Sequence, residues 1–88
     1  MIRLSKSSIS KSEKQGVLSV LDKEYLGMGE EVASFENKLT NFIGRPAVCV
    51  SSGTSALHLA LQAVGISNPD EVLVPSLTYV ASFQAISA

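Results

Sequence analysis

Apolar residues recur at three- and four-residue intervals over residues 30–43, and the positions between them are polar or charged. This spacing predicts an amphipathic helix with one apolar side facing a core. An earlier helix is predicted over residues 10–22, because Ser10 and Glu13 have the separation of a capping box. Residues 25–29 lie between the two helices and contain a Gly-x-Gly, which predicts a loop. As a signal for ligand binding, a lone Gly-x-Gly is weak.

The second half of the chain is apolar over longer runs. Residues 47–51 and 71–75 are short apolar stretches, typical of strands that are covered on both faces of a sheet. Residues 54–64 predict a helix that is apolar nearly all round, and residues 79–88 predict a last helix. The predicted order is α-α-β-α-β-α. This is an α/β fold, in which the helical connection makes the two strands parallel.

The first predicted strand leads into the stretch Ser51-Ser52-Gly53-Thr54-Ser55, just before a predicted helix. The first N–H groups of a helix have no acceptor within it, and the helix dipole favours an anion there. Gly53 lets the backbone approach an anion, and the hydroxyl groups add donors. The stretch therefore predicts either a phosphate or carboxylate site or a plain N-cap, which needs no ligand. Local sequence alone favours the cap.

The second predicted strand is followed by Tyr79 at the start of a helix. Open α/β sheets bind ligands at the carboxyl ends of their strands. The two strand exits together would suit a phosphorylated planar cofactor whose ring stacks on Tyr79. For Tyr79 taken alone, a core aromatic is the commoner role. His58 could carry protons, but a partly buried structural histidine is the better interpretation, because no carboxylate lies near it in sequence.

Charge is distributed unevenly, since every Lys and Arg lies at or before Arg45. The apolar second half leads us to expect that further protein covers it, and that the chain is the N-terminal part of a larger protein. A standalone domain or an oligomer subunit is the alternative. The net charge of −1 argues against nucleic acid or an anionic membrane as partner. The single Cys49, the absence of metal-ligand spacing and the lack of a bilayer-spanning run fit a soluble cytoplasmic protein.

Three stretches in combination resemble one known family. They are Gly29-Glu30-Glu31-Val32 with Phe35-Glu36, Val48-Cys49-Val50-Ser51-Ser52-Gly53-Thr54-Ser55-Ala56-Leu57-His58-Leu59-Ala60-Leu61, and Asp70-Glu71-Val72-Leu73-Val74-Pro75-Ser76-Leu77-Thr78-Tyr79-Val80-Ala81-Ser82. Together they resemble the start of the DegT/DnrJ/EryC1/StrS family, which are pyridoxal-phosphate-dependent sugar aminotransferases of fold type I. The resemblance covers nearly the whole chain. It implies that residues 1–88 are the N-terminal segment of the cofactor-binding domain, incomplete relative to the family.

The resemblance also implies roles for four residues. Gly53, Thr54 and Ser55 match the turn that holds the cofactor phosphate, and Tyr79 matches the aromatic that stacks on the pyridine ring. Ser55 stands where the family often has Ala, which leaves its backbone donor in place. Tyr79 stands where the family often has Phe or Trp, which retains stacking. The family's Schiff-base lysine and its pyridine-nitrogen aspartate lie downstream of these motifs, so we expect no catalytic residue in this chain and no activity from it alone.

The function that the resemblance implies is transfer of an amino group, from glutamate, to a keto sugar carried on a nucleotide. A pyridoxal-phosphate-dependent sugar dehydratase on the same scaffold is the alternative among enzymes, and a histidine in place of the downstream lysine would favour it. A non-enzymatic fragment or binding module is the alternative outside enzymes. Family members are homodimers, which implies a homodimer for the parent protein. In fold type I, later strands also lie between the two that are predicted here.

Overall fold

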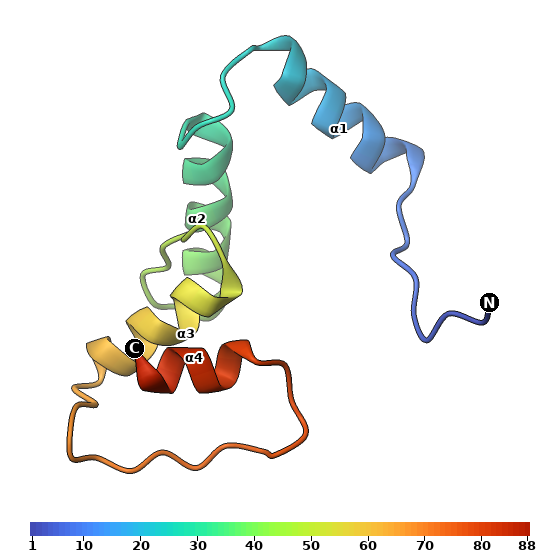
Figure 1. Cartoon of the computed structure of the whole chain (residues 1–88). Coiled ribbons are helices and arrows are strands. Elements are labelled where there is room, and N and C mark those ends of the chain that lie inside the picture. Colours follow the sequence, from blue (N-terminus) through green and yellow to red (C-terminus); the bar gives the residue numbers. More distant parts are fainter. The chain divides into compact units, whose positions relative to one another are not determined.

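The computed structural model describes all 88 residues, which divide into two compact units, Met1–Ala47 and Val48–Ala88. Each unit contains two helices (Figure 1). The four helices lie where the sequence predicts them, with ends that differ by no more than about two residues, the usual uncertainty of helix boundaries. In chain order they are α1 (Lys11–Asp22), α2 (Glu30–Ile43), α3 (Gly53–Ala63) and α4 (Ala81–Ser87).

The predicted capping box fixes the start of α1. Ser10 is the N-cap residue, and its backbone N–H donates to Oε2 of Glu13 at 2.6 Å. The Ser10 hydroxyl donates to the same carboxylate oxygen, and this bond, followed by the backbone one, lowers the pKa of Glu13 below its ordinary value of 4.5. The carboxylate also lies in the first turn, where the helix dipole favours negative charge.

A left-handed glycine ends α2. Gly44 has a φ of 77°, which residues with a Cβ rarely adopt, and its N–H donates to the carbonyl of Thr40 at 2.8 Å. The hydroxyl of Thr40 accepts a hydrogen bond from the N–H of Ala47 at 3.0 Å. The chain that leaves the helix is therefore tied back to its last turn.

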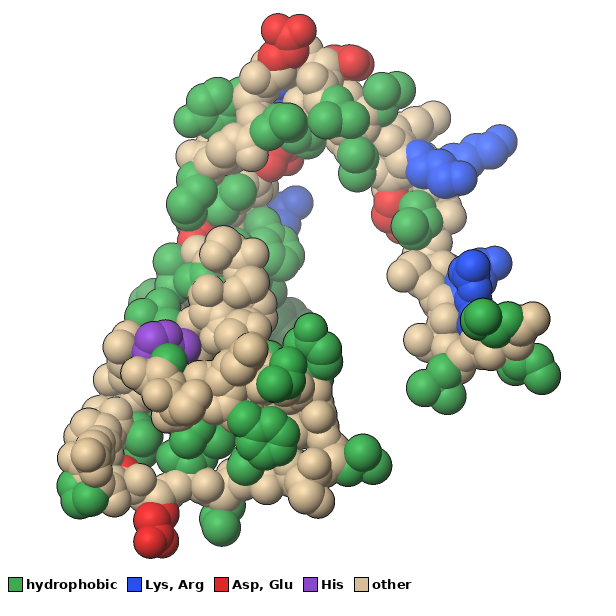
Figure 2. Space-filling model, in the orientation of Figure 1, with side chains coloured by type: hydrophobic (Ala, Val, Ile, Leu, Met, Phe, Trp, Pro, Cys, Tyr) green, Lys and Arg blue, Asp and Glu red, His purple; other side chains and the backbone are tan.

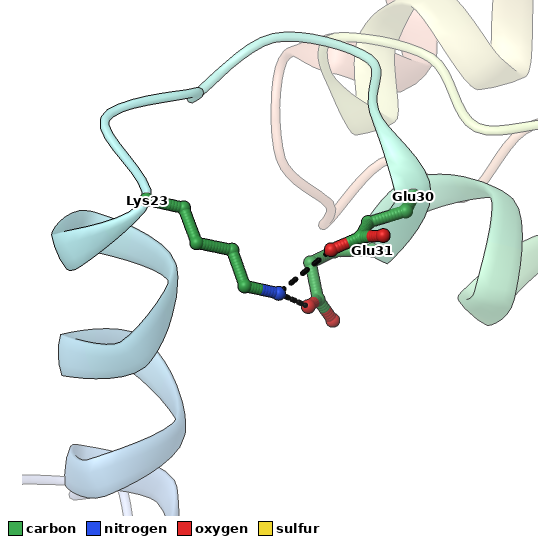
Figure 3. A network of polar contacts seen from close by, with 3 residues as sticks. All are labelled: Lys23, Glu30 and Glu31. Carbon is green, nitrogen blue, oxygen red and sulfur yellow. Dashed lines mark hydrogen bonds and ion pairs between the residues drawn. The ribbon is translucent and has the colours of Figure 1, made fainter.

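An ion-pair network connects the end of α1 to the start of α2 (Figure 3). Lys23 Nζ lies 2.8 Å from Oε1 of Glu30 and 3.0 Å from Oε1 of Glu31. The hydrogen bond to Glu30, and then the one to Glu31, raise the pKa of Lys23 above its ordinary value. The same bond to Lys23 lowers the pKa of Glu30. The predicted loop over residues 25–29 is confirmed, and this network spans it.

In the second unit, α3 and α4 pack against each other. Ala81 and Ala85 of α4 are its buried residues, with exposed fractions of 9% and 4%. Their methyl side chains let the two helix backbones approach closely. A small interface of this kind buries little apolar surface, so the unit depends on few packed side chains.

The two strands predicted at residues 47–51 and 71–75 are not formed, and the structure contains no β-strand. Residues 71–77 make no hydrogen bond within the chain. A strand needs a neighbour that takes up its N–H and C=O groups, and no second strand lies beside either segment. The helices of the predicted α-α-β-α-β-α order are thus confirmed, whereas its strands, and with them the α/β order, are not confirmed.

Large apolar side chains remain on the surface of both units, as Figure 2 shows. Phe42 on α2 is 90% exposed, although the periodicity of that helix predicts a core-facing side. In the second unit Leu73 and Leu77 are almost completely exposed. The apolar faces that the sequence predicts therefore exist but are not covered within this chain. None of the helices has the length and the hydropathy that crossing a membrane requires.

Candidate functional site

The first turn of α3 has the geometry of a capped helix start. Ser52 is the N-cap residue in an extended conformation, and its Oγ accepts a hydrogen bond from the backbone N–H of Ser55 at 3.1 Å. The Ser52 hydroxyl in turn donates to Oγ of Ser55 at 2.9 Å. The N-cap that local sequence favours is therefore confirmed.

The cap leaves part of the turn free for a ligand. The N–H groups of Gly53 and Thr54 open the helix, so no carbonyl within α3 can accept from them. A Cβ built on Gly53 would meet no atom within 4 Å, so the space beside this residue is open. Ser55 differs from its neighbours, because its N–H already donates to Ser52.

Gly53 and Thr54 line an open hollow together with Tyr79, which comes from the far end of the intervening connection. Its volume is about 600 Å³, within the range of roughly 300–1,000 Å³ that is usual for small-molecule sites. The structure thus brings together three of the four predicted cofactor residues, and Ser55 is not among those that line the hollow. The remaining lining residues are Ala56, Leu57, Ala81 and Ser82.

Tyr79 presents its side chain to solvent instead of to a core. Its exposed fraction is 78%, so the core role that is commoner for a single tyrosine is not met within this chain. The carbonyl of Tyr79 accepts from the N–H of Ser82 at 3.2 Å, which begins the first turn of α4. An exposed ring beside free N–H groups can stack on a planar ligand while those groups bind an anion.

Sequence reasoning missed Ser82 as a lining residue. Its hydroxyl lies 3.4 Å from Oγ1 of Thr78, and Ser82 itself is half-buried. The sequence carried a signal for this position. Ser82 follows Tyr79 by three residues, and residues with that spacing share one side of the helix that is predicted over residues 79–88.

The hollow contains no charged side chain. Every Lys and Arg lies at or before Arg45, in the first unit, so an anion in this hollow would meet only N–H groups, hydroxyls and the dipole of α3 within its own unit. His58 lies elsewhere and lines a separate cavity of about 440 Å³, with Asp70 among the other lining residues. That neighbourhood was not evident from the sequence spacing.

Comparison with known proteins shows which family this chain belongs to. The model of the DegT/DnrJ/EryC1/StrS aminotransferase family matches residues 7–88. GDP-perosamine synthase of Escherichia coli O157:H7 is 48% identical over 82 residues, which are 90% of this chain and 22% of that protein. GDP-perosamine synthase of Vibrio cholerae is 38% identical over 88 residues, 98% of this chain and 24% of that protein.

A relative that is named for a different sugar product is similar to nearly the same degree. The dTDP-3-amino-3,4,6-trideoxy-alpha-D-glucose transaminase of Streptomyces venezuelae is 44% identical over 73 residues, 82% of this chain and 19% of that protein. The chain therefore spans between about a fifth and a quarter of the length of these relatives. No solved structure matches the chain.

Proposed function

Because the chain belongs to the DegT/DnrJ/EryC1/StrS aminotransferase family, we propose that it supplies one wall of the cofactor site in a sugar aminotransferase. The family is pyridoxal-phosphate-dependent. When bound, this cofactor withdraws electrons from the reacting carbon of the substrate. The single observation that carries the proposal is the hollow shared by Gly53, Thr54 and Tyr79.

The phosphate is proposed to bind at the first turn of α3. The N–H groups of Gly53 and Thr54 have no acceptor within the helix, and the Thr54 hydroxyl adds a further donor. The open space beside Gly53 allows a phosphate oxygen to come close to the backbone. Ser55 is proposed to contribute its N–H, and this requires the Ser52 hydroxyl to release that donor.

Tyr79 is proposed to hold the pyridine ring by stacking. Its ring is exposed and borders the same hollow as Gly53 and Thr54. A tyrosine can stack on a heterocycle with a gain of about 0.5–1.5 kcal/mol beyond area burial. The residues of this chain would therefore bind and orient the cofactor, and they would exchange no proton with the substrate.

The reaction that we propose is transfer of an amino group from glutamate to a nucleotide-linked keto sugar, by a cytoplasmic homodimer. The names of the similar proteins, sugar transaminases and GDP-perosamine synthases, support the amino-group transfer and the nucleotide-linked sugar. The glutamate donor, the homodimer and the cytoplasmic location follow from the family resemblance alone. We propose that the lysine which carries the cofactor lies outside these 88 residues. The five lysines of the chain all precede the hollow, at Lys6, Lys11, Lys14, Lys23 and Lys38. On this view the chain has no activity by itself.

A chimera tests the proposal without any knowledge of the natural sugar. This chain replaces the segment of the Escherichia coli GDP-perosamine synthase with which it is 48% identical. Retention of pyridoxal phosphate is measured by absorbance after dialysis, and GDP-perosamine synthesis is measured separately. A chimera that folds but retains no cofactor would favour a non-enzymatic module.

Two substitutions in that chimera assign the roles within the hollow. Thr54→Ala should weaken cofactor affinity by about tenfold or more, because a hydrogen bond to a charged group is lost. Tyr79→Ala should weaken it by about three- to tenfold through lost stacking. Ser51→Ala is the matched control, since Ser51 precedes the cap and does not line the hollow. Wild-type affinity in both hollow variants would refute the assignment.

A further inference from the structure

Ser82 supplies a polar side chain to the wall of the hollow that lies opposite the first turn of α3. On the α3 side, the lining residues after Thr54 are apolar. On the other side, Tyr79 and Ser82 are the lining residues whose side chains can form hydrogen bonds. Ser82 is half-buried, and a ligand that fills the hollow would cover its hydroxyl further. A covered hydroxyl without a partner costs free energy, so the ligand is expected to supply one.

Within the chain, the hydroxyl of Ser82 has only a weak partner. Its Oγ lies 3.4 Å from Oγ1 of Thr78, which is longer than the roughly 2.5–3.0 Å that is usual between two such oxygens. Ser82 also borders a second hollow of about 330 Å³, where all the other lining side chains are apolar. That hollow offers no side-chain partner. The hydroxyl is therefore available to a ligand in the hollow that Tyr79 lines.

Ser82 and Tyr79 belong to one turn of the backbone. The N–H of Ser82 donates to the carbonyl of Tyr79 at 3.2 Å, and both side chains border the same hollow. The ring of Tyr79 would occupy one face of a planar ligand that stacks on it. A second side chain from the same turn then meets the ligand at its edge and not at its face. Contact at the edge adds what stacking lacks, because stacking alone does not fix the rotation of a ring in its own plane.

We propose that the Ser82 hydroxyl donates a hydrogen bond to the phenolic oxygen of the cofactor ring and thereby fixes the rotation of that ring on Tyr79. This inference rests on the proposed function. The phosphate of pyridoxal phosphate is assigned there to the first turn of α3, and the family resemblance gives the ring nitrogen and the aldehyde carbon to residues downstream of this chain. The phenolic oxygen is the polar group of the ring that is left, and a hydroxyl is a suitable donor to it.

The chimera with the Escherichia coli GDP-perosamine synthase tests this contact by equilibrium dialysis with two ligands. One is pyridoxal phosphate, and the other is 3-deoxypyridoxal 5′-phosphate, which lacks the phenolic oxygen. Ser82→Ala should weaken the binding of pyridoxal phosphate about three- to tenfold and change that of the deoxy analogue by less than about twofold. Ser82→Thr keeps a hydroxyl and should bind both ligands as the parent chimera does. Ser87→Ala is the matched control, because Ser87 donates to the carbonyl of Gln84 and does not line the hollow.

The deoxy analogue separates a lost contact from a general disturbance of the site. Equal weakening for both ligands in Ser82→Ala, or unchanged affinity for pyridoxal phosphate, would overturn the inference and leave the proposed function intact. A parent chimera that folds but retains no cofactor would refute the proposed function, and this inference with it. Thermal unfolding of the cofactor-free proteins, followed by circular dichroism, should be the same for Ser82→Ala, Ser87→Ala and the parent chimera.

Discussion

Ser52 and Thr54 contribute differently to the first turn of α3. Ser52 Oγ is engaged within the chain, since it accepts the Ser55 N–H at 3.1 Å. Thr54 borders the hollow shared with Tyr79 and makes no side-chain hydrogen bond within the chain. The cap and the anion site are alternative interpretations of the sequence, and they share only Ser55. Gly53 and Thr54 can bind an anion while the cap is in place, whereas the contact proposed for the Ser55 N–H requires its bond to Ser52 to open.

Removal of the cap should destabilise α3 by a measurable amount. Ser52→Ala should cost about 0.5–2 kcal/mol, whereas Ser52→Gly should cost only a few tenths. The reason is that alanine neither accepts the Ser55 N–H nor favours the extended N-cap conformation. Helical circular dichroism during urea unfolding measures the change, with Ser51→Ala as the control. Equal stability of Ser52→Ala and the parent chain would show that the cap hydrogen bond is unimportant.

At the scale of elements, the first unit is organised by polar groups at helix ends. The capping box starts α1, Gly44 ends α2, and Lys23 bridges the two helices through Glu30 and Glu31. Each of these signals is local in sequence. They therefore specify where helices begin and end even though no side chain of α1 or α2 is buried.

The capping box should make α1 depend on pH. The folded pKa of Glu13 is lowered by the hydrogen bonds from Ser10, so its contribution to stability is present above the unfolded pKa and is lost as the pH falls through the folded value. A carbon-13 NMR titration of the Glu13 carboxyl should give a pKa below 4.5. In the Ser10→Ala variant, the pKa of Glu13 from the same titration should return to its ordinary value. If the Glu13→Gln variant loses α1 helicity over the same pH range, the pH dependence of α1 arises from other groups and not from Glu13.

The Lys23 network should respond to salt. Lys23→Met should loosen the connection between α1 and α2 at low ionic strength, and the difference from the parent chain should vanish near 1 M salt, where the screening length is about 3 Å. Amide hydrogen exchange of the first turn of α2 measures this effect. Lys14→Met is the comparison, because Lys14 lies on α1 outside the network. A salt-independent difference would indicate lost packing of the lysine stem instead.

In the second unit, packing of α3 on α4 depends on small residues. Ala85 is 4% exposed, so Ala85→Leu should overpack the helix contact and cost about 1–3 kcal/mol. Gln84→Leu adds a similar side chain at an exposed position and should leave stability within about 0.5 kcal/mol. Nuclear Overhauser contacts between the two helices should weaken only in Ala85→Leu. Intact contacts in that variant would mean that the interface is looser than the structure indicates.

At the scale of the whole molecule, the apolar pattern exceeds what the chain can bury. The predicted core faces of α2, α3 and both extended segments are exposed or only half-buried, and only Ala81 and Ala85 are buried. Each of the relatives compared is at least four times as long as the matched segment. Apolar surface of this extent is usually covered by other protein. We expect further protein to cover this apolar surface.

The sequence by itself determined the four helices, the caps of α1 and α3 and the glycine that ends α2, because capping residues, terminal glycines and helical periodicity act within a few residues of each other. It also placed Gly53, Thr54 and Tyr79 at two segment exits. Only the tertiary structure showed that these three residues share one hollow, that Ser82 lines it, and that Ser55 donates to Ser52 instead. The two predicted strands are not confirmed, for a physical reason that the sequence does not show. Their residues have strand-like apolar character, but a strand requires hydrogen bonds from a distant segment, and this chain supplies no such partner.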